Sequence, residues 1–159
     1  MITEIHPGLS IADDTECLPG LQLAGTKAVI HAAKYPCHAR FVGTGKLPKE
    51  HPDYLAFIRP FDLVLNMIDP AVSLFRSETF AMTRAFARRH MSRGIPLVIH
   101  CNQGNSRAPS LALLIMAKDM HKISDESYDA ARKEFESYYP QYKPGRGIEQ
   151  YMRENWERL

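Results

Sequence analysis

The sequence predicts a three-layer α/β fold, in which helices flank a mostly parallel central sheet of about four or five strands. Short apolar runs at residues 27–32, 61–68 and 96–100 are typical of buried strands. Segments with apolar residues at helical spacing lie between and after these runs. Because strands alternate with helices along the chain, the strands are expected to pair in parallel.

The N-terminal half predicts strands separated by irregular chain. Residues 2–11 alternate loosely around His6-Pro7-Gly8, which indicates a short strand or a hairpin. Residues 13–20 predict one helical turn that ends at Pro19-Gly20. The segment 35–60 contains four prolines and is expected to be mostly loop.

The C-terminal half predicts helices. One should span residues 72–92 and end at Gly94, and a second, apolar on nearly all sides, should span 111–120 as the central buried helix. Ser124 is a candidate N-cap for the next helix. Apolar residues at helical spacing near the end of the chain, Ile148, Met152 and Trp156, predict a last amphipathic helix.

Length and composition are those of an ordinary globular protein. With 159 residues, 45% of them hydrophobic, the chain is expected to form one domain, residues 1–159. A net charge of +2 argues against nucleic acid or a membrane as partner. Three cysteines predict no disulfide framework, and the first ten residues do not resemble a signal peptide. Together these observations favour a cytoplasmic location.

Candidate catalytic and phosphate-binding residues lie together in the segment His100-Cys101-Asn102-Gln103-Gly104-Asn105-Ser106-Arg107. It joins the strand predicted at 96–100 to the helix predicted at 111–120. A tight loop at a helix N-terminus presents backbone N–H groups to an anion and stabilises a thiolate, with cysteine pKa values of roughly 3.5–7.5 in such places. Arg107 adds a two-pronged donor for phosphate oxygens. This combination indicates phosphoryl transfer through Cys101.

The motif HCNQGNSR resembles the signature loop of the cysteine-dependent protein tyrosine phosphatases, most closely that of the small dual-specificity branch. The segments IHPGLSIADDTECL and YKPGRGIEQYM, at the two ends of the chain, resemble the entry hairpin and the closing helix of that branch. The surroundings of Asp69 resemble its general-acid loop. The resemblance therefore extends over most of the chain.

The resemblance implies a role for each matching residue. Cys101 would be the nucleophile, Arg107 would bind two phosphate oxygens, and Asp69 would be the general acid and then the general base. His100 would support the loop and help to hold Cys101 as a thiolate. The backbone of the loop would complete the phosphate site, formed by Asn102, Gln103, Gly104, Asn105, Ser106 and Arg107.

One position departs from the family pattern. The residue after the arginine is usually Ser or Thr and stabilises the departing thiolate, but here it is Ala108. Ser106 and Ser110 are the nearby hydroxyls that could substitute for it. Hydrolysis of the phosphoenzyme is therefore expected to be slow. Asp53 and Asp62 remain rivals of Asp69 for the acid role.

No cofactor or metal is expected, because the thiolate, the loop backbone and Arg107 supply the chemistry. His31, Cys37 and His38 form the most compact set of possible ligands, but their spacing matches no zinc motif. Cys17 and Cys37 are expected to be core or loop residues, with a redox partnership to Cys101 as the alternative.

The leading function is dephosphorylation of a phosphorylated protein on phosphotyrosine, with phosphoserine and phosphothreonine as further candidate substrates. The same chemistry on a phosphoinositide or an RNA 5′-phosphate is the first alternative, although the neutral side chains of the loop disfavour highly charged substrates. A phosphate-binding module with little turnover is the second alternative, and Ala108 favours it. Arsenate reduction and sulfur transfer complete the alternatives. The sequence does not indicate an oligomeric state.

Overall fold

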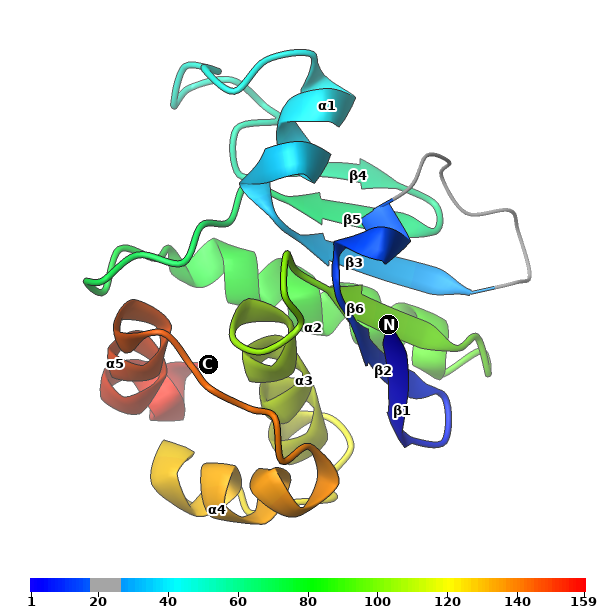
Figure 1. Cartoon of the computed structure of the whole chain (residues 1–159), viewed down its shortest axis with the longest axis vertical. Coiled ribbons are helices and arrows are strands. Elements are labelled where there is room, and N and C mark those ends of the chain that lie inside the picture. Colours follow the sequence, from blue (N-terminus) through cyan, green and yellow to red (C-terminus); the bar gives the residue numbers. More distant parts are fainter. Residues whose placement is uncertain (18–26) are drawn as a thin grey trace.

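A six-stranded sheet forms the centre of the molecule (Figure 1). The computed structural model describes residues 1–17 and 27–159. The four inner strands are parallel, and the two edge strands pair antiparallel with their neighbours. In spatial order the strands are β1 (Ile2–His6), β2 (Leu9–Ala12), β6 (Leu97–His100), β3 (Ala28–Ala32), β5 (Asp62–Leu65) and β4 (Ala56–Arg59). The predicted α/β fold with a mostly parallel sheet is confirmed.

The sheet has more strands than the expected four or five because a hairpin closes each edge. At one edge, Gly8 adopts a φ of 81° in the turn between β1 and β2, a conformation that glycine reaches without strain. At the other edge, β4 pairs with β5. β4 lies inside the segment 35–60, which was expected to be mostly loop. That segment also contains η2 (Lys34–His38) and α1 (Ala39–Val42). Residues 43–55 form the expected loop, but the expectation missed these two short helices and β4, which is half exposed and carries no strong apolar pattern.

Helices α2 (Ser77–Met91) and α3 (Arg107–Lys118) cover one face of the sheet. All residues of α3 from 108 to 117 are buried, which confirms the predicted central helix. α4 (Tyr128–Tyr138) and α5 (Arg146–Asn155), followed by η3 (Trp156–Arg158), pack on the outer side of α3. The other face of the sheet carries a smaller apolar cluster, in which Cys17, Cys37 and Val64 pack near α1. η1 (Asp14–Cys17) matches the predicted single helical turn; Pro19-Gly20 lie outside the described residues.

Two predicted helix starts were wrong. α2 begins at Ser77, not at residue 72, because residues 66–76 form an irregular loop. The carbonyl of Pro70 in this loop accepts a hydrogen bond from the Gly147 backbone N–H at the start of α5. α4 is capped by Ser127, whose Oγ accepts from the Ala130 N–H at 3.0 Å, and not by Ser124. Within the described ranges, no helix combines the length and the apolar character that crossing a bilayer requires.

The observed cap predicts different costs for two serine substitutions. Ser127→Ala removes the acceptor for an N–H at the first turn of α4 and should lower the free energy of unfolding by about 1 kcal/mol. Ser124→Ala, the matched control, removes an acceptor in an exposed turn and should lower the free energy of unfolding by less than Ser127→Ala does. Urea denaturation of the two variants measures both costs, and a larger cost for Ser124→Ala would contradict the assignment.

Candidate active site

The loop that contains Cys101 connects the carboxyl end of β6 to the N-terminus of α3. β6 lies between β2 and β3, and the Cys101 N–H donates to the Ala12 carbonyl at the end of β2, at 3.3 Å. Ligand sites of open parallel sheets lie at this end of the strands. The Cys101 side chain is buried in the main core and carries a free thiol. The hydrogen bond to Ala12 therefore holds the Cys101 backbone against the end of β2.

Arg107, the first residue of α3, is held by three acceptors from separate parts of the chain. Its Nη1 donates to the carbonyls of Ala32 at 3.1 Å and of Met67 at 2.9 Å, at the ends of β3 and β5. Its Nη2 donates to Asn102 Oδ1 at 2.6 Å. The Nε–H is buried and, among the described residues, has no hydrogen-bond partner. A buried donor without an acceptor is rare, and a phosphate oxygen is the kind of acceptor that it would take.

Gly104 and Tyr139 set the path of the loop between Cys101 and Arg107. Gly104 has a φ of 73°, and a Cβ at this position would lie 3.1 Å from the Ala12 carbonyl oxygen. Both facts require glycine. The Tyr139 hydroxyl donates to the Gly104 carbonyl at 2.8 Å. Burial raises the pKa of Tyr139, so the hydroxyl keeps its proton as a donor. Sequence reasoning missed Tyr139 because it lies just beyond α4, with no motif around it.

The segment 143–147 connects the Cys101 loop to the loop that carries Asp69. The Lys143 N–H donates to the Asn105 carbonyl at 2.7 Å, and the Gly145 N–H donates to Ser106 Oγ at 2.8 Å. On its other side, Gly145 lies against Asp69, and a Cβ there would overlap the Asp69 carboxylate. From the sequence, the motif KPGRG indicates the turn before the closing helix, with Arg146 as a weak candidate for a charge near the site. Its glycine spacing is the signal that the backbone of another loop comes close.

Residues of both loops line one pocket of about 230 Å³. Asp69 lies on one wall, and Cys101 and Arg107 belong to the opposite loop. The residues that complete the lining are Asn102, Gln103, Asn105 and Ser106. The two rival carboxylates are not part of this lining, and Asp62 is instead buried beside His31, with Oδ1 2.7 Å from Nε2. The structure thus brings Asp69, Cys101 and Arg107 together.

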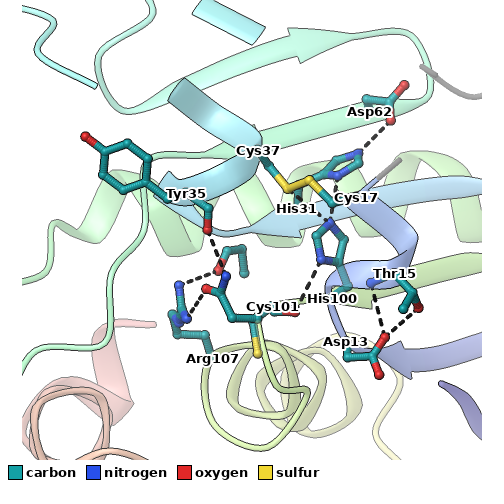
Figure 2. The surroundings of a disulfide bond; sticks show 12 residues. Asp13, Thr15, Cys17, His31, Tyr35, Cys37, Asp62, His100, Cys101 and Arg107 are labelled. Carbon is teal, nitrogen blue, oxygen red and sulfur yellow. Dashed lines mark hydrogen bonds and ion pairs between the residues drawn. A yellow bond between two sulfur atoms is a disulfide. The ribbon is translucent and has the colours of Figure 1, made fainter. Parts of the chain in front are cut away.

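His100 is buried behind the loop and faces away from the pocket. Figure 2 shows its ring turned toward His31, while the Cys101 thiol points the other way. His100 Nδ1 lies 3.5 Å from the Cys101 carbonyl oxygen. Burial, together with the neighbouring His31, lowers the pKa of His100 to about 3. The ring is neutral at physiological pH, so it supports the loop by packing and not by a positive charge next to the thiolate.

The two serines that could replace the missing family hydroxyl are engaged elsewhere. Ser110 Oγ donates to the Ser106 carbonyl at 2.7 Å and lies 2.9 Å from the Tyr142 hydroxyl. Ser106 Oγ accepts from Gly145. Ala108 is fully buried in the core cluster that also contains Cys101. Neither of these two serine hydroxyls is hydrogen-bonded to the Cys101 sulfur in the structure.

Cys17 and Cys37 form a disulfide, contrary to the expectation that the cysteines are unpaired. They lie 20 residues apart in sequence. η1 follows β2 and η2 follows β3, and these two short helices bring the Cα atoms of Cys17 and Cys37 to within 6.1 Å of each other. Sequence spacing does not reveal a pairing that depends on this topology. Both residues are buried, as expected for core residues, and Cys101 takes no part in the bond.

Three solved structures illustrate the similarity of this fold to known proteins. The human tyrosine phosphatase-like serine/threonine/tyrosine-interacting protein matches 96% of this chain and 93% of its own, with a TM-score of 0.65 and 19% identity. Human DUSP28 matches 99% of this chain and 94% of its own, with a TM-score of 0.66 and 15% identity. PTPMT1, solved in complex with PI(5)P, matches 99% of this chain and 95% of its own, with a TM-score of 0.64 and 14% identity.

No protein-family model matches the sequence, and no curated protein matches it. The structural likeness extends over nearly the whole of each chain, at identities of 14–19%. It agrees with the resemblance found in the sequence motifs. The chain has the fold of the small dual-specificity phosphatases.

Proposed function

We propose that this chain is a cysteine-dependent phosphatase, with residues 1–159 as one catalytic domain, that hydrolyses phosphotyrosine in proteins. Phosphoserine and phosphothreonine are further candidate substrates. One observation carries the proposal: a thiol, a carboxylate and an anchored guanidinium converge on one pocket, and the guanidinium Nε–H has no acceptor within residues 1–17 and 27–159. The thiol can attack phosphorus, the guanidinium can bind its oxygens, and the carboxylate can move a proton.

In the first step, the Cys101 thiolate attacks phosphorus and the P–O bond to the leaving group breaks. Asp69, as the carboxylic acid, gives its proton to the leaving oxygen, which departs as a phenol or an alcohol. Arg107 and the backbone N–H groups of the loop bind the equatorial oxygens and stabilise their charge in the transition state. The product is a cysteinyl-phosphate on Cys101 and an Asp69 carboxylate.

In the second step, the Asp69 carboxylate takes a proton from water as the water oxygen attacks phosphorus. The P–S bond breaks, Cys101 leaves as a thiolate, and inorganic phosphate is released. Asp69 again carries the proton that it needs for the next turnover. The hydroxyl that the family places after the arginine would act on the departing sulfur, and Ala108 lacks it. This step is therefore expected to limit the rate.

The rim of the pocket favours a protein substrate. The loop side chains Asn102, Gln103, Asn105 and Ser106 are neutral. Exposed apolar side chains lie in the same irregular loop as Asp69, at Ile68, Val72 and Leu74. Apolar side chains around a phosphate site suit the residues that flank a phosphotyrosine. A cytoplasmic location is part of this proposal, since Cys101 must stay reduced to react.

A phosphoinositide is the second candidate substrate. Lys143 and Arg146 are exposed on the segment that contacts the Cys101 loop, where their charges would face a second phosphate. One of the proteins with this fold, PTPMT1, was solved with PI(5)P. A panel of a phosphotyrosine peptide, a phosphoserine peptide, a phosphoinositide and an RNA 5′-phosphate, compared by kcat/KM, ranks the two candidates directly.

The nucleophile is tested by substitution. Cys101→Ser should abolish hydrolysis of para-nitrophenyl phosphate near pH 6, with and without EDTA, while calorimetry still detects binding of inorganic phosphate. Arg107→Ala should lose both activity and phosphate binding, with circular dichroism as the control for folding. Wild-type-like turnover in Cys101→Ser would contradict the proposal.

The acid role of Asp69 is tested with two leaving groups. Asp69→Asn should change hydrolysis of para-nitrophenyl phosphate little and slow that of phenyl phosphate by about 10²–10⁴-fold, because only the poor leaving group needs the proton. Gly145→Ala, which displaces the carboxylate, should show the same selectivity to a smaller degree. Asp53→Asn is the matched control and should affect neither substrate. Equal losses for both substrates in Asp69→Asn would remove Asp69 from the acid role.

The consequence of Ala108 is tested in pre-steady-state kinetics. If breakdown of the phosphoenzyme limits turnover, the wild type releases a burst of para-nitrophenol before the steady state. Ala108→Ser should then raise kcat and reduce the burst. Linear release with an unchanged kcat in Ala108→Ser would show that the second step is not limiting. Phosphate binding without turnover in the wild type would favour the binding-module alternative.

A further inference from the structure

Behind the Cys101 loop, two cysteines and two histidines bring their donor atoms together. The sulfurs of Cys17 and Cys37 and one ring nitrogen each of His31 and His100 all lie within 4.8 Å of one another. None of these residues is more than 3% exposed. Figure 2 shows the four side chains converging on one point, on the side of the sheet away from the Cys101 thiol.

The sheet builds this cluster. His31 and His100 are directly paired in the register of the parallel strands β3 and β6, so their rings lie side by side. Cys37 follows β3 in η2, and Cys17 follows β2 in η1. His31 Nδ1 lies 2.7 Å from His100 Nε2, which in turn lies 3.7 Å from the Cys37 sulfur. Four separate elements thus supply one donor each.

Each ring has an oxygen acceptor on its outer side, and the two inner nitrogens are hydrogen-bonded to each other at 2.7 Å. His31 Nε2 lies 2.7 Å from Asp62 Oδ1, an arrangement in which the ring donates its N–H to the carboxylate. His31 Nδ1 is then a lone pair. It accepts the hydrogen bond that His100 Nε2–H donates at 2.7 Å. In the metal-bound state, His100 would carry its proton on Nδ1, which lies 3.5 Å from the Cys101 carbonyl oxygen, and Nε2 would then be free to ligate. A carboxylate or a carbonyl behind a ligating imidazole is the usual second partner of histidine at a metal site.

We propose that Cys17, His31, Cys37 and His100, with both cysteines reduced, bind one structural Zn²⁺ ion. Two thiolates and two imidazoles are a standard ligand set for zinc, and the two thiolates neutralise its charge in this buried place. Zn–S and Zn–N distances near 2.3 and 2.0 Å place tetrahedral donor atoms about 3.3–3.8 Å apart. The four observed donor atoms all lie within 4.8 Å of one another, which is the spacing of one such site.

Formation of the zinc site needs no oxidant or reductant. The chain is synthesised with thiols; Zn²⁺ replaces the protons of Cys17 and Cys37, and two protons are released. The disulfide is the oxidised alternative of the same two residues. A disulfide alone gives no role to two imidazoles whose inner nitrogens face the sulfurs. The zinc ion would connect η1 and η2 to β3 and to the last residue of β6, directly before Cys101.

The test uses the Cys101→Ser chain, so that zinc cannot bind the active-site thiol. The protein is made in a reducing bacterial cytoplasm, purified with a phosphine reductant, and analysed for zinc by mass spectrometry and for thiols after unfolding. The proposal predicts two thiols and one zinc ion per chain. Cobalt substitution should give the thiolate-to-metal charge-transfer bands of a tetrahedral site with sulfur ligands.

Matched variants identify the ligands. His31→Gln in the same background should lose the zinc ion. His38→Gln should retain it, because His38 is equally buried but bonds to the Asp53 carbonyl outside the cluster. A protein that carries the Cys17–Cys37 disulfide under these conditions, or two thiols without zinc, overturns the proposal. Full zinc content in His31→Gln also overturns the ligand set. None of these readouts depends on phosphatase activity.

Discussion

The parallel pairing of β6 with β2 on one side and β3 on the other is the constraint on which the rest of the structure depends. It places Cys101 at the carboxyl end of the sheet, where the chain must turn immediately into α3. The Ala12 carbonyl limits the room at Gly104, and the Ala32 carbonyl anchors Arg107. The same register aligns His100 with His31 on the opposite face. One set of strand pairings therefore positions both the pocket and the buried cluster behind it.

Two loops form the candidate site, and a third segment holds them at a fixed position relative to each other. Residues 143–147 bond to the Cys101 loop through Asn105 and Ser106, and to the Asp69 loop through Pro70. In the proposed mechanism the Asp69 carboxylate must reach a leaving oxygen, and the hydrogen bonds of this segment place its loop relative to the Cys101 loop. Short backbone connections of this kind hold reacting groups in the geometry on which catalytic rate depends. The closing segment of the chain is accordingly part of the candidate site.

Local patterns predicted the inner strands of the sheet, the central helix, Cys101 and Arg107, whereas Asp69 was implied by the resemblance to the family's general-acid loop. Buried apolar runs identify β3, β5 and β6, because parallel strands covered on both faces have no polar side. The start of α2 and the strand β4 were not predictable in this way, since tertiary contacts decide them: Pro70 bonds to Gly147, and β4 pairs with β5. The cluster of Cys17, His31, Cys37 and His100 was missed for the same reason. Its members come from four elements, so their spacing resembles no metal motif, and only His31 and Cys37 belonged to the set considered from sequence.

In the proposed reaction, the phosphoryl group passes through the sulfur of Cys101. The most direct measurement is a rapid acid quench of the protein during turnover of an aryl phosphate, followed by mass spectrometry of its peptides. The account predicts a phosphate on the peptide that contains Cys101, at an amount that approaches one per chain if the second step is slow. A protein that turns over the substrate with no phosphorylated Cys101 peptide, or with the phosphate on another residue, would contradict it.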